Sequence, residues 1–218
     1  MDFFSIIVRA IVLMTTIPIH EAAHAYVADR LGDPTARYSG RLTLNPMAHF
    51  DLFGSLMLLF TGIGWAKPVP INPNNFKDRK KGMAISAAAG PISNIIVAAI
   101  SLAIAKIILY SSYSLGANMV LSTLFTIFRT MCFINISLAI FNLLPFPPFD
   151  GSRIFNCFLS DKWYFKIMEY EQYIFMGLFI VLVTGILDGP LSILTSIVFS
   201  ALDKLTVFVD VIGNTLLL

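Results

Sequence analysis

The sequence has few charged residues, few cysteines and few histidines. Of its 218 residues, 13% are charged, against about 25% in typical soluble domains. Its 15 basic and 13 acidic residues nearly balance, so no strong field attracts nucleic acid and no nucleic-acid partner is expected. Cys132 and Cys157 are too few for a disulfide framework or a thiolate metal site. Its 3 histidines are too few for the histidine boxes of a membrane di-iron oxygenase.

Apolar residues dominate the chain, at 57% of the sequence and a mean hydropathy of +0.79. A spanning helix needs about 20 mostly apolar residues. We therefore expect an all-α polytopic membrane protein with roughly five to six transmembrane helices. No repeat, linker or low-complexity tract divides the chain, so residues 1–218 are expected to form one domain with a membrane-associated tail at 190–218. The predicted spans are residues 3–30, 83–110, 117–144, 172–188 and 190–218.

Two segments between the first long apolar runs have a different character. Residues 52–64 are apolar but too short for a clear span, which favours a re-entrant segment. Residues 37–46 alternate polar and apolar side chains between Gly and Pro residues, a pattern typical of a short β-hairpin. We expect this hairpin to lie near the membrane surface.

Basic residues predict the orientation in the membrane. If residues 52–64 dip in and return, then 30–81 and 153–166 lie on one side and carry 11 of the 15 basic residues. The positive-inside rule makes this side cytoplasmic and places the N-terminus outside. The first apolar run also has the length of a signal-peptide core, but it lacks a positive leading region and is expected to remain in the mature protein.

The first predicted helix contains three ionisable residues within one turn, namely His20, Glu21 and His24. Each such residue costs about 2.5 to 3.5 kcal/mol on insertion scales, so a functional reason is expected. Histidines four residues apart share a helix face and lie about 6 Å apart along the axis. This is the HExxH zinc pattern. The alternative is a chance match in which both histidines are satisfied core residues.

A zinc site of this kind needs a third protein ligand and a general base. Glu21 follows a ligand directly, so it can take the proton of the attacking water. Candidates for the third ligand are His49 and acidic residues near an apolar boundary. Asp150 is the only charge in the proline-broken stretch 141–151, although it could instead cap a helix that begins at Ser152.

Three motifs together resemble the site-2 protease family of intramembrane zinc metalloproteases. They are His-Glu-Ala-Ala-His at 20–24, Ala-Gly-Pro-Ile-Ser-Asn at 89–94, and Asn142 to Gly151 ending in Asp-Gly. The resemblance implies one Zn²⁺ per chain held by His20, His24 and Asp150, with Glu21 as the catalytic base. It also implies a multi-pass protein of the cell membrane that hydrolyses peptide bonds of transmembrane proteins or peptides. The chain looks like a short, compact bacterial or archaeal member without a PDZ domain.

The depth of the motif supports the same interpretation. A helix that enters the bilayer near residue 3 places His20 about 26 Å along its axis, close to the far boundary of a core about 30 Å thick. The active site is therefore expected near the cytoplasmic face, where water has a short path.

Substrate contacts follow from the need to unwind a helical substrate. An extended substrate could pair with the free edge of a hairpin at 36–46 or with the loop at 64–73, although the hairpin could simply pack on the membrane. Asn94 and Asn142 are candidates to stabilise the transition state, and His49 to contact substrate.

The competing function is a non-enzymatic metal-binding scaffold or carrier in the membrane. A carrier is expected to show paired half-repeats with broken helices in matching positions, and the sequence has no such symmetry.

Overall fold

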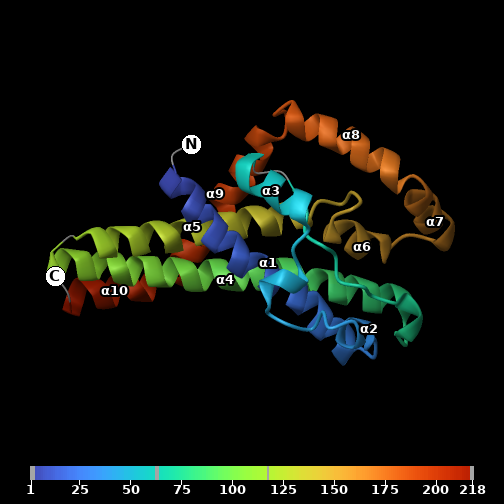
Figure 1. Cartoon of the computed structure of the whole chain (residues 1–218), viewed down its shortest axis with the longest axis horizontal. Coiled ribbons are helices and arrows are strands. Elements are labelled where there is room, and N and C mark those ends of the chain that lie inside the picture. Colours follow the sequence, from blue (N-terminus) through green and yellow to red (C-terminus); the bar gives the residue numbers. More distant parts are fainter. Residues whose placement is uncertain (1–2, 62–63, 117, 217–218) are drawn as a thin grey trace.

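The computed structural model describes residues 3–61, 64–116 and 118–216, and within these ranges it contains helices and no strands (Figure 1). Three helices are long and apolar enough to cross a membrane, namely α1, α4 and α5. The α9 and α10 pair would make a fourth span if its 48° bend lies inside one crossing. The helices are α1 Phe3–Arg30, α2 Thr35–Tyr38, α3 Leu52–Thr61, α4 Arg79–Leu115, α5 Met119–Asn142, α6 Asp150–Asn156, α7 Asp161–Glu169, α8 Glu171–Val183, α9 Asp188–Leu205 and α10 Val207–Leu216.

The all-helical polytopic class is confirmed, but the expected five to six spans are too many for the described residues. The predicted span at 172–188 contains α8, which has only 13 residues and is about 20 Å long, short of a bilayer core. The predicted tail span is broken where α9 ends at Leu205 and α10 begins at Val207.

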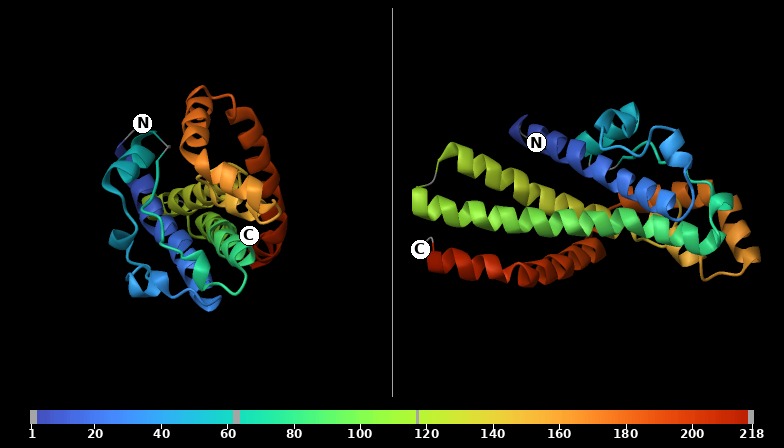
Figure 2. Two further views of the ribbon diagram at one scale, coloured as in Figure 1. Left: turned by 90° about the vertical axis from the view of Figure 1, so that its right-hand side faces the viewer. Right: turned by 90° about the horizontal axis from the view of Figure 1, so that it is seen from below.

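The centre of the molecule is an antiparallel pair formed by α4 and α5, with α1 crossing both (Figure 1). A buried apolar cluster joins α4, α5 and α9 through Ala98, Leu102, Cys132, Ile136, Ile140 and Leu202. At the crossing of α1 and α5, the buried Asn135 amide donates a hydrogen bond of 2.9 Å to the Thr16 hydroxyl. Figure 2 shows α9 and α10 running beside the central pair, and both contact it.

The end of α1 is stopped by Gly32, which has a φ of +104° that favours glycine. The next residue, Asp33, is fully buried and ties three parts of the chain together. Its carboxylate accepts hydrogen bonds from the backbone N–H groups of Thr35 and Asn72 and from the side-chain amide of Asn75. The loop before α4 is thereby fixed against the end of α1.

The prediction of a β-hairpin at 36–46 is wrong. Residues 35–38 form the short helix α2, and a 3₁₀ turn follows at Pro46–Ala48. Asp33 accepts from the N–H of Thr35 and starts the helical turn, while the N–H of Arg41 donates to Ala36 C=O at 2.8 Å. These local bonds use the backbone groups that a hairpin would pair across its strands.

Within the predicted segment 52–64, the described residues Leu52–Thr61 form a short helix, α3. Helix α3 has 10 residues, about 15 Å of helix. Residues 62 and 63 lie outside the described residues, so the re-entrant path stays a prediction. After them, the chain is extended from Ala66 to Asn72 and passes beside the HExxH turn of α1.

Candidate metal centre

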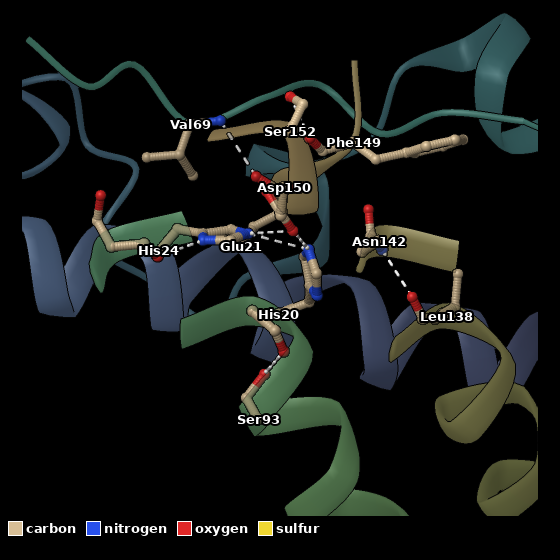
Figure 3. Close-up of polar contacts among 12 residues, drawn as sticks. His20, Glu21, His24, Val69, Ser93, Leu138, Asn142, Phe149, Asp150 and Ser152 are labelled. Carbon is tan, nitrogen blue, oxygen red and sulfur yellow. Dashed lines mark hydrogen bonds and ion pairs between the residues drawn. The ribbon is translucent and has the colours of Figure 1, made fainter. Parts of the chain in front are cut away.

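Helix α1 places His20 and His24 on one buried face, as their spacing predicts. Their Nε2 atoms are 3.0 Å apart, and the two imidazole rings meet edge to face. Both side chains are buried, with 9% and 6% of each residue exposed. Two ring nitrogens therefore point at the same small volume inside the helix bundle (Figure 3).

The carboxylate of Asp150 reaches the same point from the start of α6. Its Oδ2 atom lies 3.3 Å from Nε2 of His20 and 3.3 Å from Nε2 of His24. One ligand atom from each of the three residues lies within 4.8 Å of the others. Asp150 also begins α6, so its position at a helix start and its role beside the histidines are compatible.

Gly151 explains how Asp150 reaches this position. A Cβ atom at Gly151 would overlap the backbone carbonyls of Leu143 and Leu144, so only glycine lets the start of α6 pack against the end of α5. The chain between them folds back over a proline-rich turn. The Asp-Gly pair therefore combines a ligand with the residue that allows its approach.

The cluster fits a zinc ion. Ligands bound tetrahedrally at about 2.0 to 2.1 Å lie about 3.3 Å from one another, which matches both imidazole-to-carboxylate distances. Asp150 Oδ2 is buried without a conventional hydrogen-bond partner among the described residues. Two imidazole nitrogens and a carboxylate oxygen are the donors that zinc prefers in catalytic sites.

The charge state of Asp150 suits this role. Burial alone raises the pKa of its carboxyl group, but the close contacts with His20 and His24 outweigh that effect and hold the pKa below its ordinary value. The group is therefore ionised at neutral pH, and an ionised carboxylate is the form that binds a cation.

Helix α4 orients one imidazole and makes room for both. Nδ1 of His24 lies 2.8 Å from the carbonyl oxygen of Ser86, so Nδ1 carries the proton and Nε2 keeps its lone pair free. One turn later, a Cβ at Gly90 would come within 3.0 Å of both imidazole rings. Only glycine lets α4 approach α1 this closely.

Glu21 is buried beside the cluster and is held by the extended segment after α3. The backbone N–H of Val69 donates to Glu21 Oε2 at 3.1 Å (Figure 3). One carboxylate oxygen is therefore fixed by a backbone hydrogen bond. A group held in this way can accept a proton from a neighbouring water.

His49 lies outside the metal cluster. Its Nε2 lies 2.8 Å from Thr43 C=O and its Nδ1 lies 3.4 Å from the guanidinium of Arg41. Arg41 is buried and donates to the carbonyls of Lys67 and Pro68, just before Val69. His49 and Arg41 therefore support the segment that holds Glu21.

The two asparagines differ in their surroundings. Asn94 lies one turn beyond Gly90 on α4, is fully buried, and neither its amide nitrogen nor its oxygen has a partner among the described residues. Asn142 lies half-buried at the end of α5, and its amide nitrogen donates to Leu138 C=O at 2.9 Å (Figure 3). Asn94 thus has unused hydrogen-bonding capacity.

Three contributors to the site escaped the sequence reasoning: the carbonyl of Ser86, the missing side chain of Gly90 and the N–H of Val69. Gly90 carried a signal, because small residues recur at 86, 87 and 90 on one face of the predicted helix. Backbone groups leave no such signal in the sequence.

The chain is similar in sequence to known proteins. A family model described as peptidase family M50 matches residues 106–184, which include Asp150. "Putative zinc metalloprotease YwhC" of Bacillus subtilis is 39% identical over 175 residues, covering 80% of this chain and 79% of that protein. "Putative zinc metalloprotease Rip2" of Mycolicibacterium smegmatis is 25% identical over 176 residues, covering 78% of this chain and 64% of that protein. No solved structure matches the chain.

Proposed function

Because the chain belongs to peptidase family M50, the site-2 protease family of zinc metalloproteases, we propose that it hydrolyses peptide bonds of transmembrane proteins or peptides. His20, His24 and Asp150 hold one catalytic zinc ion in this proposal. The observation that carries it is the convergence of these three ligand atoms within 4.8 Å, directly beside a buried glutamate.

Each residue has a separate task. His20, His24 and Asp150 bind the metal, and Ser86 C=O keeps His24 in the tautomer that can ligate it. A bound zinc ion supplies an acidified water and polarises the scissile carbonyl. Glu21 takes the proton from the attacking water and passes it to the leaving amine. Its bond to Val69 N–H keeps one oxygen fixed while the other handles the proton.

The substrate binds as an extended strand along residues 67–72. Backbone groups of every second residue share one edge of an extended chain, so Val69 and Ile71 present theirs on the side of Glu21. The structure gives no hydrogen-bond partner to Val69 C=O or to Ile71 N–H and C=O within the described residues. A substrate strand can add to these groups next to the base.

Asn94 donates to the oxyanion of the tetrahedral transition state. Its buried amide has no partner among the described residues, and an unpaired buried amide gains most from a charge that develops during the reaction. Asn142 is a second candidate, with one amide hydrogen beyond its bond to Leu138. His49 acts through Arg41 on the position of residues 67–69.

The site faces the cytoplasm in this proposal, and the chain works as one intramembrane domain over residues 1–218 with a membrane-associated tail at 190–218. Helices α1 and α5 end, and α4 begins, at the site end of the bundle (Figure 1). The predicted cytoplasmic segments 30–81 and 153–166, which hold most basic residues, adjoin that end.

The first test separates the base from the metal ligands. Glu21→Gln is expected to keep full zinc content yet reduce cleavage of a model transmembrane peptide by at least about 1,000-fold, because the carboxylate that takes the proton is gone. Zinc is measured on detergent-purified protein, and cleavage is followed with and without a chelator. The matched control is Glu169→Gln, at an exposed position on α7. Undiminished cleavage by Glu21→Gln would remove Glu21 from the role of base.

The second test concerns the ligand that is distant in sequence. Asp150→Ala is expected to lose zinc and all chelator-sensitive cleavage, since two imidazoles alone bind zinc weakly. Asp188→Asn, at an exposed position at the start of α9, serves as the control and is expected to retain both. Stoichiometric zinc with normal affinity in Asp150→Ala would refute ligation by Asp150. Zinc bound by the unmodified chain without any proteolysis would favour the scaffold instead.

A further inference from the structure

A cavity of about 520 Å³ is lined by residues of α1, α3 and α5. Leu13 of α1, Leu58 of α3 and Phe141 of α5 are among its mostly apolar lining residues. Two arginines also line it, Arg9 of α1 and Arg129 of α5. Two cations in one apolar cavity within candidate spans need an explanation.

Both arginines lie on the same side of the contact between α1 and α5. Helices α1 and α5 are joined where Asn135 donates to Thr16, and they run in the same direction because antiparallel α4 lies between them in the chain. Arg9 precedes Thr16 by seven residues and Arg129 precedes Asn135 by six, so each lies about 9 to 11 Å before the joint along its helix. Each arginine thus precedes the contact by about two helical turns, and both are among the residues that line the cavity.

Neither arginine has an ion-pair partner in the described part of the chain. No acidic residue lines the cavity. Arg129 is exposed, and its guanidinium lies 5.8 Å from the centre of the Phe133 ring, a contact that leaves its hydrogen-bond donors free. Arg9 is only half-buried. An anionic group is the partner that this pair lacks.

The cavity leads toward the metal centre. Its lining includes Phe141 at the end of α5, and the Phe141 ring packs against Phe149 with ring centres 6.4 Å apart. Phe149 directly precedes Asp150, the proposed ligand. Along α1, Arg9 lies 11 residues before His20, about 16 Å away along the axis. A chain that fills the cavity can therefore reach both the arginines and the catalytic site.

We propose that this cavity binds the still-membrane-embedded part of the substrate, and that Arg9 and Arg129 recognise a carboxylate in it. The inference rests on the proposed protease function and adds a substrate preference to it. Among hydrophobic segments of similar length, one with an acidic residue about 16 Å from the scissile bond is favoured. The same charges discriminate against segments with a basic residue at that depth.

Binding is tested with the full chain carrying Glu21→Gln, which binds without cleaving, in nanodiscs of zwitterionic phosphatidylcholine. The probes are leucine–alanine transmembrane peptides of about 25 residues in which a single Glu is moved along the sequence, each with a Gln twin. Glu peptides are expected to bind about tenfold more tightly than their twins at one narrow set of positions. We expect that preference to be removed by Arg9→Gln and also by Arg129→Gln. Arg9→Lys is expected to keep most of the preference because it keeps the charge. The control Arg37→Gln is expected to leave the preference intact.

Two outcomes overturn the inference. One is an equal affinity for Glu and Gln peptides at every position, or a preference that survives in the Arg9→Gln, Arg129→Gln double variant. The other is a loss of peptide binding when phosphatidylglycerol replaces part of the lipid, together with binding of phosphatidylglycerol that depends on Arg9 and Arg129. That result would make the cavity a site for anionic lipid. Zinc content and thermal midpoint identify any variant that fails to fold, and the comparison of Glu peptides with their Gln twins on the Glu21→Gln chain then carries the test.

Cleavage is measured separately, with the unmodified chain and the Gln peptides. Chelator-sensitive cleavage of these neutral peptides supports the proposed function whatever the arginines recognise. Absence of cleavage of every peptide contradicts the proposed function, while the Glu preference of the Glu21→Gln chain still decides the inference.

Discussion

Two polar clusters lie among the apolar helices, and they differ in how their charges are satisfied. Lys106 of α4 lies 2.8 Å from Asp203 and 2.5 Å from Asp210, and Tyr110 donates to Asp210 at 3.2 Å. In the cluster of His20, His24 and Asp150, a carboxylate and two ring nitrogens converge, and no lysine or arginine contacts them within the described residues. The charges of the first cluster are paired within the protein, whereas the second offers three ligand atoms that could hold a cation.

The difference explains why only one cluster is proposed as a reaction centre. In the Lys106 cluster the ammonium group also contacts Asp203 C=O, so all three of its hydrogens can be used and α4 is fastened to α9 and α10. A satisfied network of this kind stabilises one arrangement of helices. Ionisable groups in a span therefore have to be judged by their partners as well as by their depth.

Among changes that test this comparison, the largest effect is expected from adding a side chain next to the cluster of His20, His24 and Asp150. Gly90→Ala places a Cβ against both imidazole rings and is expected to lower zinc affinity and kcat/KM by about 10-fold to 100-fold or more, because the ligands are forced apart. Zinc competition and peptide cleavage measure the two quantities. Gly177→Ala on α8, where an added Cβ meets nothing within 4 Å, is the control. Full affinity in Gly90→Ala would mean that α4 yields easily at this contact.

A smaller effect is expected from breaking the closed cluster. Lys106→Met leaves two carboxylates without a cation and is expected to reduce stability by about 2 kcal/mol, less than for a fully buried pair because Asp203 is half exposed. Zinc content should stay unchanged. Thermal unfolding in detergent measures the loss, with Lys204→Met at an exposed position as the control. Loss of zinc in Lys106→Met would show that the two clusters are coupled.

The smallest effect concerns a closed network outside the spans. Burial raises the pKa of Asp33, but hydrogen bonds from Thr35, Asn75 and Asn72 outweigh it and lower the pKa below its usual value of 3.8. A lowered pKa in the folded state stabilises the fold above pH 3.8, and this contribution is lost as the pH falls through the folded-state pKa.

The difference in thermal midpoint between the unmodified chain and Asp33→Asn is therefore expected to shrink as the pH falls from neutral to below 3.8. Asp188→Asn should show no such trend, since Asp188 is exposed. A difference that stays constant across this range would mean that the charge of Asp33 does not contribute.

The sequence was sufficient for the local part of the site. His20, Glu21 and His24 belong to one helical turn, so their common face follows from the helical repeat alone. The grouping of Asp150 with the histidines followed from a lone charge in an apolar, proline-broken stretch together with the family resemblance. The structure brings these residues together, while their roles remain predictions.

The errors arose where short-range hydrogen bonds decided the structure. The alternation at 37–46 indicated strands, but Asp33 and the turn after Thr35 produced α2 instead. The count of spans was too high because hydropathy does not show where a helix stops, as at the ends of α8 and α9. Ser86 C=O and Val69 N–H were out of reach because every residue except proline carries the same backbone groups.

The hydrogen bond from Val69 to Glu21 has a mechanical consequence. The segment from Lys67 to Asn72 is anchored to His49 and Arg41 at one end and to Asp33 at the other. A bound peptide that displaces Val69 would also displace Glu21, because a hydrogen bond of 3.1 Å joins the two residues. A ligand that docks in the wrong register would then misalign the glutamate as it settles, so tight occupancy of this edge and slow turnover can occur in the same molecule.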